Sequence, residues 1–148
     1  MLTARLVQMI ESRSSELSQG LLHKLQSSER FSDLRRRVPA DELEERTYEI
    51  YRNLSDWLLG KSEAEIERRY LEIGARRAAQ GVAFSQFLWA FLCTKQHLHD
   101  FLRLEVFMEN PMELYGELEL VQALDQFFDR ALYYAAVGYE RARTAKAA

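Results

Sequence analysis

The sequence predicts an all-α protein, a single helical bundle of five or six helices. Apolar residues recur at alternating three- and four-residue steps along most of the chain, which is the spacing of one helix face. Only 2 prolines and 6 glycines occur in 148 residues, which leaves little room for the turns of an all-β protein. A hydrophobic content of 47% and a charged content of 29% are typical of a globular protein. We therefore expect one domain over residues 1–148, with 140–148 a tail or linker.

The first part of the chain predicts a helix followed by a short helix or turn. Residues 2–25 carry apolar side chains at helical spacing, with a joint expected at the serine pair 14–15 or at Gly20. The stretch FSDLRRR, residues 31–37, predicts the short helix or turn. We interpret its arginine run, 35–37, as a solvated helix end, with a phosphate or lipid site as the alternative.

A second helix is expected from Pro39 to Gly60. Proline suits the first position of a helix, where its missing N–H is not needed. Gly60 stands where a left-handed C-cap is expected. One apolar stripe runs between them and comprises Leu43, Thr47, Ile50, Tyr51, Leu54, Trp57 and Leu58.

The third helix is bounded by two local signals. Ser62 and Glu65 form a capping box at its start, and Gly81 occupies the C-cap position at its end. Gly74 lies on the inward stripe, so its missing side chain should let another helix approach closely. The stripe comprises Ile66, Tyr70, Ile73, Gly74, Arg77 and Ala78.

Residues 84–108 predict a fourth helix that is apolar on more than one side. Such a helix is either central to the core or used at a subunit contact. Pro111 suits the start of a last long helix, whose apolar stripe runs to Tyr139.

The off-face residues of the fourth helix indicate an interaction surface. Tryptophan and phenylalanine near an arginine match the composition of interface hot spots. The alternative is that the last helix covers this flank within one subunit. The interface or pocket residues that we predict are Trp89, Cys93, Leu104 and Phe107, with Tyr133 and Tyr134 from the last helix.

Candidate catalytic and metal-binding residues do not converge. His97 and His99 are two apart, so on a helix they point to nearly opposite sides, and His23 is distant. Cys93 with His97 supplies one pair, whereas a zinc site needs more ligands. We expect Cys93 to be a buried small hydrophobe rather than a nucleophile. A haem-binding gas sensor that uses His97 or His99 is the alternative to no cofactor.

The acidic residues also favour a structural interpretation. They lie in runs such as ELEER and EAEIERR, which suit pairs on a solvated helix face. The chain contains no phosphate loop or nucleotide fingerprint. We therefore expect that the protein is not an enzyme and binds no metal.

The net charge and the length of the longest apolar stretch limit which kinds of partner the protein can bind. A net charge of -3 argues against a nucleic-acid module. The longest apolar stretch is far below the ~20 residues that span a bilayer. The single cysteine fits a reducing compartment. We expect a cytoplasmic protein that contacts neither nucleic acid nor membrane.

The stretch from Tyr70 to Val82 resembles a known family. It reads Tyr70-x-x-x-Gly74-x-x-Arg77-Ala78-x-x-Gly81-Val82, is preceded by DWLLG, and is followed by VAFSQFLWAF and TKQHLHDFL. These motifs and the order of helices resemble the RsbRD-type N-terminal sensory domain of stressosome RsbR-like co-antagonists. The similarity covers about residues 5–142.

The resemblance implies a helical, globin-like or related bundle that forms a homodimer and passes a signal to an attached domain. It implies no haem in the stressosome members and no catalytic residues. The matching residues Tyr70, Gly74, Arg77 and Gly81 are then structural. In the family an output domain such as STAS usually follows. We expect either a protein that stands alone or an excised N-terminal domain.

Overall fold

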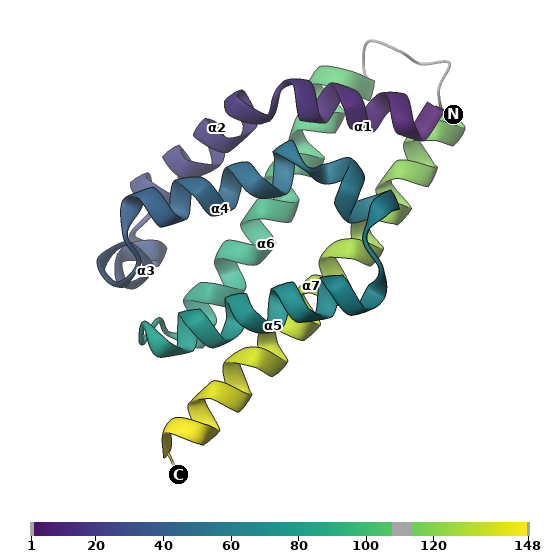
Figure 1. Ribbon diagram of the computed structural model, residues 1–148. Coiled ribbons are helices and arrows are strands. Elements are labelled where there is room, and N and C mark those ends of the chain that lie inside the picture. Colours follow the sequence, from purple (N-terminus) through teal and green to yellow (C-terminus); the bar gives the residue numbers. More distant parts are fainter. Residues whose placement is uncertain (1, 108–113, 148) are drawn as a thin grey trace.

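The computed structural model describes residues 2–107 and 114–147, with side chains described within 4–104 and 116–145. These residues form helices and connecting turns without a strand, which confirms the all-α prediction (Figure 1). The α-helices are α1 (Leu2–Ser12), α2 (Ser14–Ser27), α3 (Ser32–Arg37), α4 (Ala40–Arg52), α5 (Glu63–Ala79), α6 (Phe84–Phe101) and α7 (Leu114–Ala147). Three short helical segments join them: η1 (Glu29–Phe31), η2 (Asp56–Gly60) and η3 (Leu102–Phe107).

The number of α-helices in the described residues exceeds the five or six expected because the first part of the chain is divided. The joint expected at serines 14–15 falls at Arg13, between α1 and α2, and Gly20 lies inside α2. Arg35 is not a solvated helix end: its Nη1 donates to the carbonyls of Leu25 and Ser28 at 2.7 and 2.6 Å, where α2 ends. Arg36 and Arg37 are exposed.

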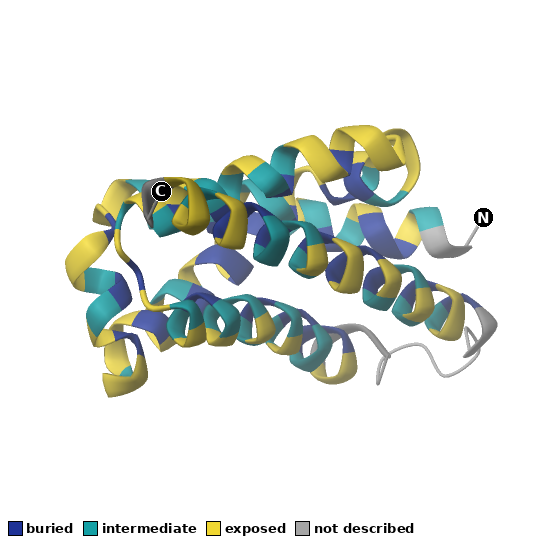
Figure 2. Ribbon diagram, turned by 90° about the horizontal axis from the view of Figure 1, so that it is seen from below, coloured by how far each residue is buried: buried dark blue, intermediate teal, exposed yellow. Residues whose placement is uncertain are grey.

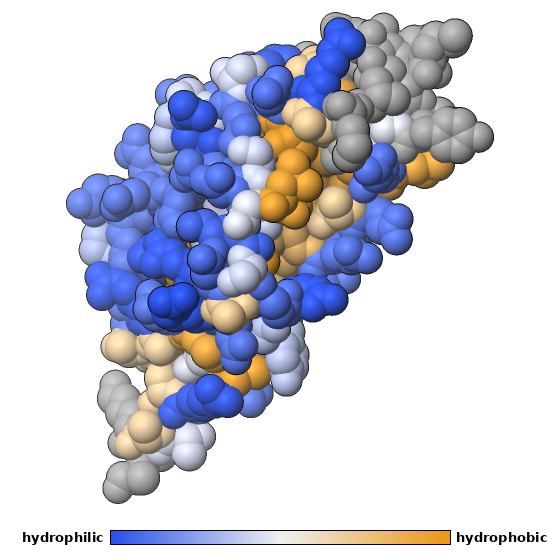
Figure 3. Space-filling view, turned by 45° about the vertical axis from the view of Figure 1, so that its right-hand side comes forward, coloured by the Kyte–Doolittle hydropathy of each residue, from blue (hydrophilic) through white to orange (hydrophobic). Residues whose placement is uncertain are grey.

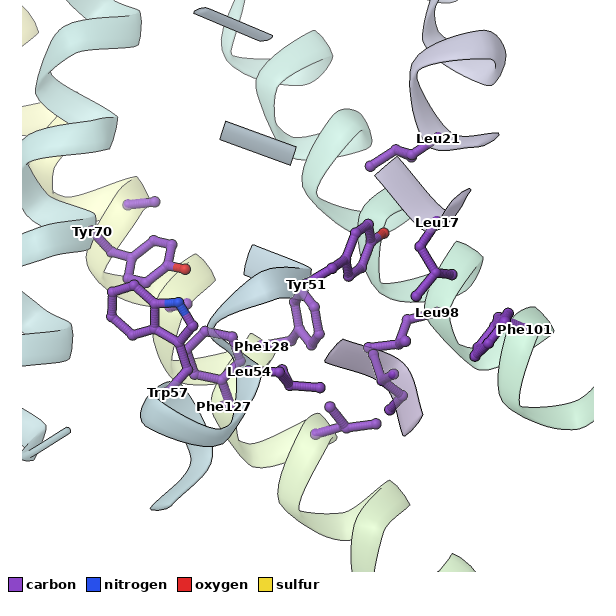
Figure 4. Packing of buried hydrophobic residues seen from close by; sticks show 14 of the residues in the cluster. Leu17, Leu21, Tyr51, Leu54, Trp57, Tyr70, Leu98, Phe101, Phe127 and Phe128 are labelled. Carbon is purple, nitrogen blue, oxygen red and sulfur yellow. The ribbon is translucent and has the colours of Figure 1, made fainter. Parts of the chain in front are cut away.

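The helices pack so that each turns one face inward, as Figure 2 shows. α2 and α4 lie side by side, α6 passes behind them, and the long α7 runs past one end of α1 and across α5 (Figure 1). The buried faces meet in an aromatic cluster (Figure 4). There, the rings of Trp57, Tyr70 and Phe127 lie within 5.6 to 5.9 Å of one another.

The helix expected from Pro39 to Gly60 is shorter and broken. Pro39 is the N-cap, with ψ at 142°, so the helix begins at Ala40 rather than at the proline. α4 ends at Arg52, and both the backbone and the side chain of the following Asn53 donate to the Glu49 carbonyl, at 3.2 and 3.3 Å. The prediction of a left-handed cap at Gly60 is wrong: Gly81 alone has a positive φ among the described residues.

Both predicted ends of α5 are confirmed. The Ser62 hydroxyl accepts from the Glu65 amide, and the Glu65 carboxylate accepts from the Ser62 amide, each at 3.2 Å. Gly81 has φ of 76°. Its N–H donates to the Ala78 carbonyl at 3.0 Å, and the Val82 N–H donates to the Arg77 carbonyl at 3.1 Å. This is a Schellman motif, and the buried Val82 completes it.

α5 and α7 cross at two glycines. A Cβ on Gly74 would lie 2.8 Å from the Ala135 carbonyl carbon and 2.9 Å from the Tyr139 amide nitrogen. A Cβ on Gly138 would collide with the backbone of Leu71 in the same way. The close helix approach predicted at Gly74 is therefore confirmed. α7 then continues through the expected tail to Ala147, and its side chains beyond Tyr139 are mostly exposed up to residue 145.

Candidate functional site

A partly open cavity lies between α4 and α5. The backbones of these two helices do not pack closely over their described lengths, although both pack on other helices. The cavity between them has a volume of about 80 Å³. Its wall is completed by α6, by Leu25 of α2 and by Leu34 of α3. The other lining residues are Leu43, Arg46, Thr47, Glu49, Ile50, Tyr70, Ile73, Arg77, Phe87, Ala90, Phe91 and Thr94.

Two carboxylates of α4 connect it to α5 by ion pairs. Glu49 accepts from Arg69 of α5 at 2.8 Å and from Arg46 of its own helix at 3.1 Å. Two turns earlier, Glu42 pairs with Arg76, lies 3.6 Å from Arg77, and accepts from Gln80. Polar contacts therefore connect α4 to α5 beside the cavity.

The Glu42 cluster favours the charged carboxylate. Burial alone would raise the pKa of Glu42, but hydrogen bonds from Arg76 and Gln80 and the charge of Arg77 outweigh it, so the pKa lies below its usual value. Arg77 is 4% exposed, and burial lowers its pKa against the opposing effect of Glu42. The sequence placed Glu42, Arg46 and Arg69 in runs suited to a solvated helix face. Glu42 and Arg69 instead pair between helices.

Tyr70 contributes an unpaired hydroxyl to this cavity. The residue is 2% exposed, and its hydroxyl has no hydrogen-bond partner among the described residues. Burial first, and the charge of Glu49 second, raise its pKa, so the hydroxyl stays protonated. Figure 4 shows this hydroxyl directed toward the middle of the core, on the side of Tyr51. Tyr51 differs, because its hydroxyl donates to the Thr94 carbonyl at 3.0 Å.

Trp89 and Cys93, two of the predicted surface residues, lie together. They line a shallow surface hollow on α6, which Leu92, Lys95, Gln96 and His99 share with Asp125 of α7. Trp89 is 41% exposed, and the Arg30 guanidinium lies 5.2 Å above its ring. Cys93 is half-buried, and burial raises the pKa of its thiol. The thiol is therefore a poorer nucleophile than a free cysteine.

The other predicted surface residues lie elsewhere. Leu104 lines a different hollow, on the α2 side of α6. The Phe107 side chain lies outside the described residues, as does Pro111. Tyr133 is 64% exposed on α7, whereas the Tyr134 hydroxyl bonds to Glu63 at the start of α5. The Glu63 bond and the charge of Glu63 raise the pKa of Tyr134.

The two histidines of α6 point to different helices, as their spacing predicted. His97 Nε2 lies 3.0 Å from the Leu17 carbonyl of α2, and His99 Nε2 lies 3.1 Å from Asp125 of α7. The other ring nitrogen of His97 is buried and has no partner among the described residues, and burial lowers the pKa of this imidazole. Neither histidine lines the cavity between α4 and α5. In the part of the chain that the structure describes, no three His, Cys, Asp or Glu residues are grouped to hold a metal ion.

The structure places the motif residues of α5 next to both the cavity and the α5–α7 crossing. Tyr70, Gly74 and Arg77 lie on the same inward stripe of α5, where Tyr70 and Arg77 line the cavity and Gly74 meets α7. These features define a class of protein: a helical bundle with a small, partly polar cavity next to a tight helix crossing. Within the described residues, no helix is long and apolar enough to cross a membrane.

The chain belongs to the family described as the RsbT co-antagonist protein rsbRD N-terminal domain, whose family model matches residues 15–148. The family is one of stressosome-type signalling and regulatory domains. The searches of curated proteins and of solved structures returned no significant match.

Proposed function

We propose that this chain is a non-enzymatic signalling domain that forms a homodimer and relays a signal through helix packing to an output domain or a partner protein. Membership of the signalling family supports the regulatory role. The exposed aromatic and aliphatic surface along α6 and α7 supports self-association.

The α6–α7 surface carries the dimer proposal. Lys95 of α6 lies 3.4 Å from Asp129 of α7, and His99 lies 3.1 Å from Asp125, so the two helices run antiparallel along this seam. Trp89 precedes Lys95 and Tyr133 follows Asp129, which brings both to the same end of the seam. Single exposed apolar residues are ordinary, whereas grouped ones mark interaction sites, so the grouping of Trp89, Leu92 and Tyr133 along α6 and α7 supports the proposal.

The α5–α7 crossing supports the relay. At Gly74 the two backbones are in contact, so α7 cannot slide along α5 without changing this packing. α7 also contacts α6 at the seam. A change at the dimer surface or in the cavity would therefore reach α7, whose last described residue is Ala147.

Exposed apolar residues are not confined to the α6–α7 surface. Leu59 of η2 is 65% exposed, and Figure 3 shows a band of apolar side chains crossing an otherwise hydrophilic face. Leu59 therefore provides a matched control. Static light scattering on Trp89→Glu and Leu59→Glu should show dissociation in the first variant only. Dissociation in neither variant, or equally in both, would contradict the assignment of the surface.

The alternative is a haem-binding gas sensor. Both α6 histidines already use Nε2 for a contact inside the protein, and the cavity of about 80 Å³ is far smaller than a porphyrin. These contacts favour the haem-free proposal. An absorption spectrum of freshly purified protein distinguishes the two, because a Soret band would support the haem sensor.

A further inference from the structure

We propose that the cavity between α4 and α5 is a binding site for a small, uncharged molecule with an apolar body and one hydrogen-bonding group, which the Tyr70 hydroxyl anchors. The site would be the input of the proposed signalling domain. The inference rests on that function only for its biological role, since binding is a property of the cavity itself.

The Tyr70 hydroxyl is the polar anchor because it makes no hydrogen bond to another described residue. Buried tyrosine hydroxyls usually find a partner. Tyr51 donates to the Thr94 carbonyl at 3.0 Å, and Tyr139 donates to the Val82 carbonyl at 2.6 Å. Tyr70 is 2% exposed and lines the partly open cavity, and its hydroxyl bonds to no described residue. A ligand that accepts or donates one hydrogen bond would satisfy it.

The size of the cavity sets the size of the ligand. A volume of about 80 Å³ exceeds the roughly 10–15 Å³ that one water needs. It is smaller than the roughly 150 Å³ of an engineered cavity that admits benzene. A molecule on the order of three to five non-hydrogen atoms therefore fits without repacking of the wall.

The charges at the cavity favour an uncharged ligand. Arg46 is paired with Glu49, and Arg77 lies 3.6 Å from Glu42. An ion would lose its hydration without gaining an uncommitted counter-charge, which is costly in a mostly apolar wall. The remaining wall is largely aliphatic and aromatic, which suits the apolar body of the ligand.

A ligand can enter without separating α4 from α5, because the cavity is already partly open to solvent. The Arg69–Glu49 and Arg76–Glu42 pairs bridge the two helices. Glu42 and Glu49 are only 13% and 27% exposed, so these pairs hold the helix spacing while the ligand enters.

Propan-1-ol is a suitable probe because it has four non-hydrogen atoms and one hydroxyl. The measurement is a titration followed by the methyl NMR signals of Ile50 and Ile73, which face the cavity from opposite helices. We expect saturable shifts in the unchanged protein. The variant Tyr70→Phe should bind about tenfold more weakly, because it lacks one hydrogen bond but retains the cavity.

The matched control is Tyr51→Phe, which removes a buried hydroxyl that already has a partner and does not line the cavity. It should bind propan-1-ol as the unchanged protein does. The proposal is overturned if the Ile50 and Ile73 signals show no saturable shift, or if Tyr70→Phe binds with unchanged affinity. Sedimentation of the same samples reports the dimer separately. Saturable binding to a strict monomer would contradict the proposed dimer and leave the ligand site in place.

Discussion

Gly74 shows how much one missing side chain determines in this protein. Its Cβ position is occupied by the backbone of α7, so the residue fixes how closely the two helices approach. The sequence predicted this role because Gly74 lies on the inward stripe of a helix that otherwise favours larger residues. The partner positions Ala135 and Gly138 could not be predicted, because small residues on α7 occur on several faces.

The variant Gly74→Ala should be strongly destabilising. A methyl group there cannot fit without separating α5 from α7, since it meets rigid backbone rather than a flexible side chain. We expect a loss of about 1–3 kcal/mol or more in the free energy of unfolding, and a larger loss for Gly74→Leu. Urea denaturation measures it. An unchanged midpoint for Gly74→Ala would show that the crossing is wrongly described.

At the scale of elements, the two ends of α5 were predictable and the end of α4 was not. Ser62, Glu65 and Gly81 act through local hydrogen bonds, so the sequence contains the whole signal. Gly60 looked equivalent to Gly81, but Asn53 ends α4 earlier and η2 brings Trp57 into the aromatic cluster. Tertiary burial of Trp57 outweighs the local signal at this point.

Substitution of the two glycines separates these cases. Gly81→Ala should cost about 1 kcal/mol, because alanine is strained at a φ of 76°. Gly60→Ala should be neutral or slightly stabilising, because its Cβ would have ordinary contact with Asp56 and its φ is not positive. Thermal unfolding compares the two variants. Equal losses would mean that Gly81 does not form the cap.

The Glu42 cluster gives the α4–α5 connection a pH dependence. The pKa of Glu42 is lower in the folded than in the unfolded protein, so its stabilisation is present above pH 4.5 and is lost as the pH falls through the folded pKa. Glu42→Gln should cost about 1–3 kcal/mol at pH 7, and the difference from the unchanged protein should shrink below pH 4.5.

Glu44 serves as the control for this prediction. It is exposed on the same helix and its side chain has no partner among the described residues, so Glu44→Gln should leave the stability nearly unchanged at every pH. Denaturant unfolding between roughly pH 3 and pH 8, a range that includes the titration of carboxylates near about pH 4, gives both curves. A pH-independent loss in Glu42→Gln would show that the ion pairs do not contribute as described.

At the scale of the whole molecule, helical periodicity predicted the fold class, and the Tyr70–Val82 stretch indicated the family. The cavity was not predictable. It arises where α4 and α5 are held apart, and the Glu42 and Arg69 contacts that span this interval join residues far apart in the sequence. The surface residues were only partly brought together. Trp89 and Cys93 share one hollow, whereas Tyr134 is bonded to α5.

The central claim is that this signalling domain works as a homodimer. Sedimentation velocity of the unchanged protein, from low to high micromolar concentration, tests it most directly. We predict a concentration-dependent shift from a 17.4 kDa species to one of twice that mass. A single 17.4 kDa species over the whole range would contradict it.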